Sequence, residues 1–269
     1  RKLQVILKEK RRLQLRSSLG GDHHPTPDRA AHRLRKPQRI RAAGADIVGS
    51  RIEDDAAALV GLLTEMDDEE TGCTIVAIVG PDGIGKTTLA RKVYGSERIR
   101  LGFGAARAWL RVPREYSEAG LLSQVVDSFG GGDMTGGESF ADLEKSLARL
   151  VEGKRCLLVL DDVRYGGVWE GVLRRPLQRA GRGSKVLVTA RHGSIAREMG
   201  ARHVHRVKRL DSDGAWLLLR AAASVAGEAS AAELNGVGHG IADKCGGVPL
   251  AIKAVAGVLT TRDASAQEW

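Results

Sequence analysis

The chain has 269 residues, of which 42 % are hydrophobic and 28 % are charged, and its formal net charge is +9. This composition is typical of a globular protein, and no apolar run approaches the roughly 18–20 residues that a membrane-spanning helix requires, so we expect no membrane span. Three cysteines, far apart and without metal-ligand spacing, argue against a disulfide framework; we expect reduced thiols and a cytoplasmic location.

The positive charge is confined to the N-terminal arm. Residues 1–41 contain 13 Lys and Arg against 3 Asp and Glu, whereas the remaining residues carry a net charge of −1. Leucines spaced among basic residues in 1–19 predict the end of an amphipathic helix, and a Gly- and Pro-rich run at 20–27 ends it. Because no aromatic residues are interleaved with the basic ones, we interpret residues 1–41 as a basic helical stub and flexible linker and expect no specific nucleic acid partner.

A helix is expected at residues 52–63, where apolar residues recur on one face. The short run Ile47-Val48-Gly49 precedes it. The acidic run at 66–70 follows it and is expected to be a loop.

The stretch 80–88 fits the phosphate-loop pattern G-x-x-x-x-G-K-[ST]. The apolar run 74–79 before it predicts a buried strand, and residues 89–94 after it predict a helix. A glycine-rich turn in this context presents backbone N–H groups to phosphate oxygens at a helix N-terminus, whose dipole favours anions. Lys86 would reach the β- and γ-phosphates, and the Thr87 hydroxyl would ligate Mg²⁺. The candidate nucleotide-binding residues of this loop are Gly80, Gly83, Ile84, Gly85, Lys86, Thr87 and Thr88.

After this loop, residues 105–112 predict a strand, and residues 119–129 and 140–151 predict helices. A glycine-rich run at 130–137 separates the two helices. No strand precedes this run, which therefore favours a flexible surface loop over a second nucleotide loop.

Two carboxylates follow the next apolar run, residues 156–160. A continuous apolar run of this kind marks a strand buried on both faces of a parallel sheet. Ligands of open α/β sheets bind at the C-terminal ends of the strands, which is where Asp161 and Asp162 stand. Beside a phosphate loop, Asp161 is placed to hold Mg²⁺, and Asp162 to orient or deprotonate a water as a catalytic residue together with Lys86. The alternative is that the acidic pair only caps the next turn.

Another buried strand is expected at residues 185–189, and Arg191 follows its end. A guanidinium there could reach a terminal phosphate and distinguish ATP from ADP. On spacing alone, an exposed loop arginine is the favoured interpretation, and only the succession of polar residues at strand ends favours a phosphate contact. Residues 203–207 alternate like a short fifth strand.

From Asp211 onward the pattern is helical. Asp211 is expected to cap a helix at residues 214–223, and Ser230 has the spacing of a capping box that opens the next helix. Pro249 stands at the first turn of a helix at 250–259.

The predicted fold is α/β: a P-loop NTPase with a parallel sheet flanked by helices, followed by a small all-α subdomain. We expect the nucleotide-binding domain at residues 42–208 and the helical subdomain at 209–269.

The order of these motifs resembles that of the NB-ARC domain of plant NLR immune receptors. This domain is a STAND-class P-loop ATPase, and animal apoptotic-protease activators contain it too. The resemblance covers about residues 46–269, and the basic stub is similar to the end of the coiled-coil domain that many of these receptors carry. The matching blocks are Ile47-Val48-Gly49, residues 80–88, the strand around Trp109, residues 157–163, residues 183–191, Trp216-Leu217-Leu218 and residues 245–251.

This resemblance implies a switch in plant defense that binds ADP at rest and exchanges it for ATP to open and oligomerise, with slow hydrolysis as the reset. It implies that Val48 and Gly49 border the adenine, that Pro249 packs on it from an ARC1-like subdomain, and that Arg191 senses the γ-phosphate. It also implies intramolecular partners, namely the N-terminal coiled coil and C-terminal leucine-rich repeats of a longer receptor.

The chain departs from the family pattern at three positions, where Arg164, Ala190 and Val248 replace Trp, Thr and Leu. None of these changes removes a phosphate-binding or metal-binding group. We expect the winged-helix subdomain that usually locks ADP in place to lie beyond residue 269.

Two other functions stay open at this point. One is a turnover ATPase, or a nucleic-acid-stimulated ATPase that uses the basic arm. The other is a purely structural scaffold, which the intact Lys86, Thr87, Asp161 and Arg191 argue against.

Overall fold

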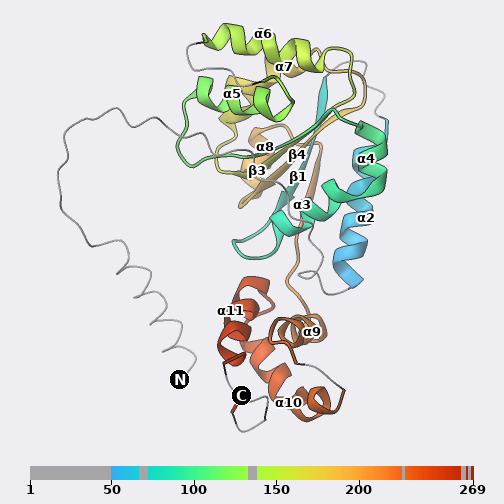
Figure 1. The fold of residues 1–269 in the computed structure, drawn as a ribbon, viewed down its shortest axis with the longest axis vertical. Coiled ribbons are helices and arrows are strands. Elements are labelled where there is room, and N and C mark those ends of the chain that lie inside the picture. The colour runs from blue at the N-terminus through green and yellow to red at the C-terminus, as the bar shows by residue number, and fades with distance from the viewer. Residues whose placement is uncertain (1–49, 67–71, 133–137, 226–227, 262–264, 266–267) are drawn as a thin grey trace, which may run out of the picture. The chain divides into compact units, whose positions relative to one another are not determined.

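The computed structural model describes residues 50–66, 72–132, 138–225, 228–261, 265 and 268–269 (Figure 1). Within them, parallel strands form one sheet in the order β2-β3-β4-β1-β5. The apolar runs that predicted buried strands become the three central ones, as expected for a sheet covered on both faces. The strands are β1 (Cys73–Val79), β2 (Arg107–Arg111), β3 (Leu157–Val163), β4 (Ser184–Ala190) and β5 (His203–Arg206).

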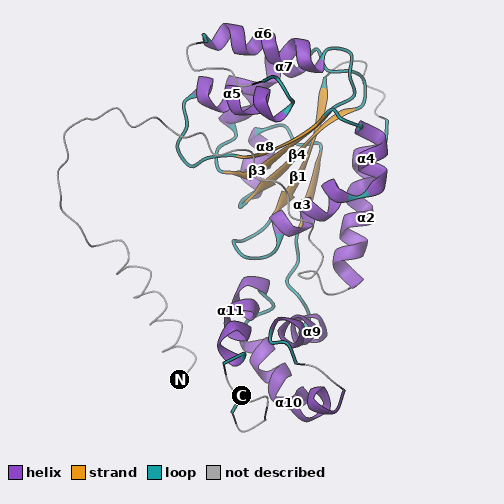
Figure 2. Ribbon diagram, in the orientation of Figure 1, coloured by secondary structure: helices purple, strands orange, loops and turns teal. Residues whose placement is uncertain are grey.

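One face of the sheet packs against α2 (Ser50–Thr64), α3 (Lys86–Gly95) and α4 (Glu97–Phe103) (Figure 2). Every second residue of the central strands points into this core, because side chains alternate across a strand. The buried strand residues on this face are Val76, Ile78, Leu157, Val159 and Leu187.

The opposite face packs against α5 (Glu118–Ser128), α6 (Phe140–Val151), the π-helical turn η1 (Trp169–Leu173), α7 (Arg174–Leu177) and α8 (Gly193–Glu198). The intervening strand residues fill this second core. They are Ile75, Ala77, Val79, Ala108, Leu110, Leu158, Leu160, Val163, Val186, Val188 and Ala190.

The C-terminal helices α9 (Ser212–Ala222), α10 (Glu228–Lys244) and α11 (Pro249–Leu259) enclose a separate hydrophobic core. The Asp211 carboxylate accepts the Gly214 N–H at 2.9 Å and caps α9 as predicted. Pro249 occupies the first turn of α11. A backbone N–H at this position has no hydrogen-bond partner within the helix, so the lack of one in proline costs nothing there. The α/β fold class with a helical region after it is therefore confirmed.

The predicted start of the second C-terminal helix is wrong. Helix α10 begins at Glu228, so Ser230 lies inside the helix instead of capping it. The residues before and after Ser230 are mostly Ala and Glu, which favour helix strongly enough to extend it upstream.

Four short elements were not predicted, namely α4, η1, α7 and α8. Each spans at most 7 residues, too few for an apolar period to stand out in the sequence. Strand β3 also runs farther than expected and includes both aspartates.

Several predictions concern residues outside the described ranges. These are the basic stub and linker, Val48, Gly49, most of the acidic run at 66–70 and part of the glycine-rich run at 130–137. Among the helices that the structure describes, none combines the length and apolar character needed to cross a membrane.

The contact between Gly238 and Trp216 gives a test of the helical core. A Cβ added to Gly238 of α10 would lie 2.1 Å from the Trp216 ring, whereas one added to Gly236 of the same helix would meet no atom within 4 Å. We expect Gly238→Ala to lower the free energy of unfolding by about 1–3 kcal/mol through overpacking. Gly236→Ala, the matched control, should raise it by up to about 1 kcal/mol, because Ala favours helix over Gly.

Urea titration followed by tryptophan fluorescence measures both effects. Equal stabilities for the two variants would contradict the packing of α9 on α10.

Candidate nucleotide-binding site

The phosphate-loop stretch connects β1 to α3, in the position that the sequence predicts. The Gly80 N–H donates to the Ala190 carbonyl of β4 at 3.3 Å, which ties the start of the loop to the sheet. Gly83 and Gly85 have φ angles of 78° and 108°, in the left-handed region that favours glycine. The Ile84 side chain is only 3 % exposed and anchors the loop in the protein interior. The loop conformation therefore follows from its glycines and one buried apolar residue.

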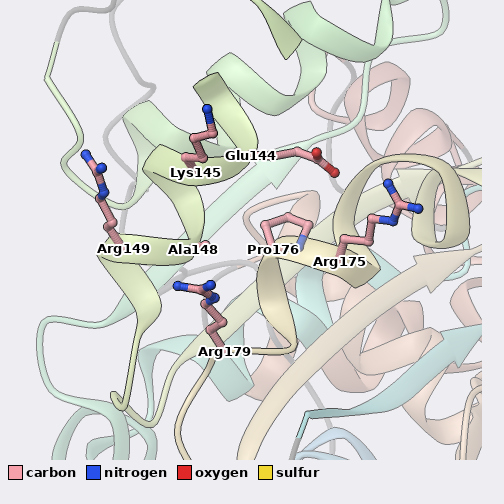
Figure 3. Close-up of a pocket in the computed structure, with 7 residues that line it drawn as sticks. All are labelled: Glu144, Lys145, Ala148, Arg149, Arg175, Pro176 and Arg179. Atoms are coloured by element: carbon pink, nitrogen blue, oxygen red, sulfur yellow. The ribbon is translucent and has the colours of Figure 1, made fainter. Parts of the chain in front are cut away.

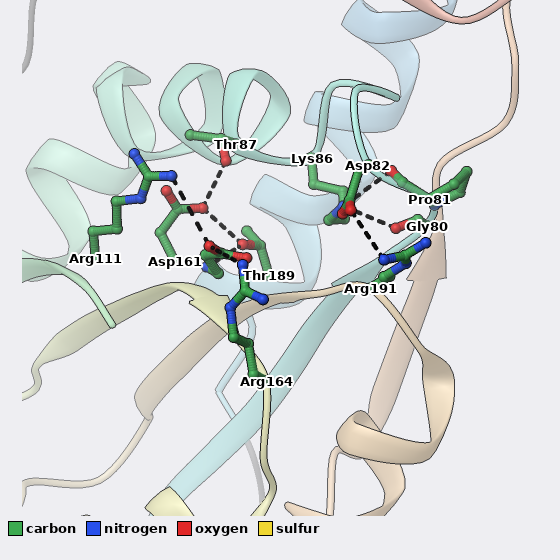
Figure 4. Close-up of polar contacts among 11 residues, drawn as sticks. Gly80, Pro81, Asp82, Lys86, Thr87, Arg111, Asp161, Arg164, Thr189 and Arg191 are labelled. Carbon is green, nitrogen blue, oxygen red and sulfur yellow. Dashed lines mark hydrogen bonds and ion pairs between the residues drawn. The ribbon is translucent and has the colours of Figure 1, made fainter. Parts of the chain in front are cut away.

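Lys86 is the first residue of α3, and its side chain turns back over the loop (Figure 4). Its ammonium donates to the carbonyl oxygens of Gly80 at 2.8 Å and Pro81 at 3.0 Å. Burial lowers the pKa of the Lys86 ammonium, and the negative charge of Asp82 opposes that shift most strongly. The ammonium thus sits within the loop that would surround a phosphate, next to Thr87 and Thr88 in the first turn of α3.

The Asp161 carboxylate lies at the C-terminal end of β3 and is 2 % exposed. Its Oδ1 accepts hydrogen bonds from the hydroxyls of Thr87 and Thr189, each at 2.7 Å. These two bonds join the first turn of α3 to the ends of β3 and β4. A buried carboxylate needs such donors, because removing its charge from water is costly.

The same oxygen atoms fit the preferences of Mg²⁺. A hydroxyl and a carboxylate are hard ligands, and Mg²⁺ commonly takes one or two from the protein and the rest from phosphates and water. In the part of the chain that the structure describes, no group of three or more His, Cys, Asp or Glu is arranged to hold a metal. Thr87 and Asp161 offer two oxygen ligands of this kind.

Asp162 has an unusual backbone, with a φ of 66°. Its N–H donates to the Thr189 hydroxyl at 2.9 Å, which helps to hold a conformation that costs about 1–3 kcal/mol for a residue with a side chain. Its carboxylate is 35 % exposed and lies 3.1 Å from the Arg164 guanidinium and 3.9 Å from that of Arg111. A strained, half-exposed carboxylate at the ligand edge of a sheet is a common feature of functional sites.

Arg191 follows β4 and reaches the phosphate loop. Its guanidinium lies 3.2 Å from the Asp82 carboxylate and is 60 % exposed. Pro249 begins α11, and the N–H of the next residue, Leu250, donates to the Gly83 carbonyl at 3.1 Å. The loop is therefore contacted both by a strand-end arginine and by the first turn of a C-terminal helix.

The structure brings together the predicted candidates that it describes, namely Gly80, Gly83, Ile84, Gly85, Lys86, Thr87, Thr88, Asp161, Asp162 and Arg191, with Pro249 next to the residue that bonds the loop. Val48 and Gly49 lie outside the described residues.

Four further residues at this site had no role predicted from the sequence. Thr189, which bonds Asp161, was detectable because it ends a strand at the same sheet edge. The ion pairs of Asp82 with Arg191, and of Arg111 and Arg164 with Asp162, had no comparable signal. They depend on where side chains point from loops and from the end of β2.

A shallow groove between α6 and α7 shares no residue with this site (Figure 3). Its charged lining consists of Glu144, Lys145, Arg149, Arg175 and Arg179. It contains no strand-end carboxylate and no glycine-rich turn, and the loop between β1 and α3 remains the candidate nucleotide site.

Comparison with known families supports this assignment. The sequence-family model of the NB-ARC domain matches residues 52–228. Disease resistance protein RPP13 of Arabidopsis thaliana is 34 % identical over 246 residues, which cover 88 % of this chain and 28 % of that protein. Disease resistance protein RGA2 of Solanum bulbocastanum is 33 % identical over 203 residues, which cover 75 % of this chain and 21 % of that protein. The chain thus spans less than a third of the length of these relatives.

Solved structures with a similar fold include CDC6P from Pyrobaculum aerophilum, with a TM-score of 0.59 and 17 % identity, over 81 % of this chain and 65 % of that one. The Aeropyrum pernix ORC2 protein, in ADPNP–ADP complexes, has a TM-score of 0.55 and 18 % identity over the same shares. At these identities the likeness concerns the fold alone. The match of the family model to residues 52–228, more than half of the chain, shows that the chain belongs to the NB-ARC domain family.

Proposed function

We propose that this chain is the ADP- and ATP-binding switch core of an intracellular plant immune receptor, in which slow ATP hydrolysis returns the switch to its resting state. One observation carries the proposal. The hydroxyl of Thr87 in the phosphate-loop helix is hydrogen-bonded to the buried carboxylate of Asp161 at the end of β3. This pairing puts a hydroxyl, a carboxylate and the Lys86 ammonium around one loop, the combination that binds a metal–nucleotide complex.

In this proposal the loop amides and Lys86 bind the nucleotide phosphates. Lys86 exchanges the carbonyls of Gly80 and Pro81, which are neutral acceptors, for charged phosphate oxygens, which make stronger hydrogen bonds. Thr87 and Asp161 would hold Mg²⁺, which neutralises phosphate charge when bound.

Asp162 is proposed as the residue that orients and deprotonates the attacking water. Its carboxylate is partly exposed, so it is accessible to a water in a way that the buried Asp161 is not. The same carboxylate is 3.1 Å from the Arg164 guanidinium, which competes for its oxygen atoms. Hydrolysis is therefore expected to be slow.

The switch itself is proposed to act through the contact of Leu250 with Gly83. A ligand shifts a conformational equilibrium only if its contacts differ between the two states. The hydrogen bond from the Leu250 N–H to the Gly83 carbonyl links α11 to the loop that binds the phosphates. A change in the loop upon nucleotide exchange would therefore alter a contact with the helical region. Arg191 is proposed to supply the difference between ATP and ADP by binding the γ-phosphate.

Further roles are proposed from family membership. Val48 and Gly49 would border the adenine, and Pro249 would pack on it from the helical region. In a longer receptor, the partners would be its own coiled-coil and leucine-rich-repeat domains and other copies that join a nucleotide-dependent oligomer. A cytoplasmic location is proposed on the same basis.

The first test removes the phosphate-binding ammonium. We expect Lys86→Ala to weaken binding of ADP and ATP about 100-fold or more, because hydrogen bonds to charged groups each contribute about 1.5–3 kcal/mol. Lys92→Ala is the matched control, since Lys92 lies on the same helix but pairs with Glu53 away from the loop. Calorimetric titration measures affinity, and circular dichroism checks that the fold is kept. Similar affinities of wild type and Lys86→Ala would overturn the proposal.

The second test separates hydrolysis from binding. We expect Asp162→Asn to slow single-turnover ATP hydrolysis about 100-fold, the low end of general-base contributions, while the ADP affinity stays within about two-fold. Rapid-quench assays with radiolabelled ATP give the rate. An unchanged rate would assign the base to another group.

The alternative, an ATPase stimulated by nucleic acid through the basic arm, makes a different prediction in the same assay. DNA or RNA would accelerate hydrolysis, and the acceleration would decline steeply with salt. The switch proposal expects slow hydrolysis that neither nucleic acid changes.

A further inference from the structure

The phosphate loop carries an acidic residue between the two cations that face it. Asp82 occupies a position that the phosphate-loop pattern leaves unspecified. Its Oδ2 lies 3.2 Å from the Arg191 guanidinium, and its Oδ1 lies 3.8 Å from the Lys86 ammonium (Figure 4). One carboxylate thus pairs with both of the cations that are proposed to bind nucleotide phosphates.

This arrangement has no evident structural purpose. The Asp82 side chain is 68 % exposed, and exposed ion pairs typically contribute only about 0–1 kcal/mol to folding. The turn itself is provided by Gly83 and Gly85, which have positive φ, and is anchored by the buried Ile84. The charge of Asp82 therefore matters more for what the loop binds than for how it folds.

A carboxylate here opposes phosphate binding in two ways. Its negative charge repels every phosphate in the loop, and the repulsion grows with the number of phosphates. Its ion pair also occupies Arg191, which must leave Asp82 before it can contact a terminal phosphate. The second effect concerns only a nucleotide whose γ-phosphate reaches Arg191, so it acts on the triphosphate and not on the diphosphate.

We propose that Asp82 is a specificity-determining residue of the nucleotide site, which favours nucleoside diphosphate over triphosphate by holding Arg191 in an ion pair. The inference rests on the proposed function, because it assumes that the loop binds nucleotide and that Arg191 contacts the γ-phosphate. It adds a built-in competitor for that arginine. Activation would then require the γ-phosphate to displace the Asp82 carboxylate.

The experiment is a double-mutant cycle on the chain of 269 residues. The variants are wild type, Asp82→Asn, Arg191→Gln and the double variant. Calorimetry measures the affinities for Mg²⁺·ADP and for a non-hydrolysable ATP analogue with Mg²⁺. Each affinity is measured in low salt and again in about 0.5 M salt, which screens exposed charges. The ratio of the two affinities is the deciding quantity, because a purely structural role of Asp82 would leave this ratio unchanged.

We expect Asp82→Asn to increase the affinity for the ATP analogue about five-fold more than the affinity for ADP, which corresponds to the contribution of one exposed ion pair. In the Arg191→Gln background, Asp82→Asn should change the ratio by at most about two-fold, because no guanidinium remains to be released and only the screened repulsion of the additional phosphate is left. High salt should reduce the selective gain. Glu170→Gln, which breaks an exposed carboxylate–arginine pair of 2.8 Å in η1 and α7, is the matched control and should change neither affinity.

Two outcomes would overturn the inference alone. In the first, Asp82→Asn increases the affinity for both nucleotides equally; in the second, its full selective effect persists without Arg191. If wild type binds neither nucleotide, the proposed function and the inference fail together. If wild type binds both and loses them in Lys86→Ala, but the ratio never depends on Asp82, the proposed function stands and only the inference fails.

Discussion

The Asp161 carboxylate, buried between two threonine hydroxyls, is the interaction on which the candidate site depends. Thr87 belongs to the first turn of α3 and Thr189 to the end of β4, so their bonds to one oxygen atom connect the phosphate loop to two neighbouring strands. A buried charge that loses its donors is left with an uncompensated desolvation penalty of a few kcal/mol, so this geometry is strongly favoured. The loop is therefore held at the sheet edge before any ligand arrives, and a nucleotide would find the proposed metal-binding groups already assembled.

Around this fixed centre, Arg191 and Asp162 lie in partly exposed ion pairs, whereas the less exposed Lys86 ammonium is bonded to two loop carbonyls. Lys86, Arg191 and Asp162 each pair with a partner that phosphate or water could replace, and most of these pairs are exposed. The contact of Leu250 with Gly83 adds a link to the helical region. A nucleotide-dependent switch requires contacts that differ between its two states, since a ligand acts only through such contacts. The proposed metal-binding edge, the exchangeable ion pairs and the contact to a second group of helices could provide them.

The sequence was sufficient for the sheet and for the residues at its C-terminal edge. Continuous apolar runs made β1, β3 and β4 recognisable, and the topology rule for parallel sheets then placed Asp161 and Arg191 near the phosphate loop. The rest depended on information that local patterns do not carry. Helix α10 starts earlier than its capping signal, because neighbouring helix-forming residues outweigh that signal. The ion pairs of Asp82 and Arg164 arise from loop conformations that bring together side chains with no shared period.

The proposed switch requires that the loop between β1 and α3 retains an adenine nucleotide. This is tested by purifying the chain without added nucleotide, denaturing it and identifying what is released by chromatography. We expect ADP at close to one molecule per chain. A chain that releases no nucleotide, and that also shows no binding when Mg²⁺·ADP and Mg²⁺·ATP are titrated into it, would contradict the proposal.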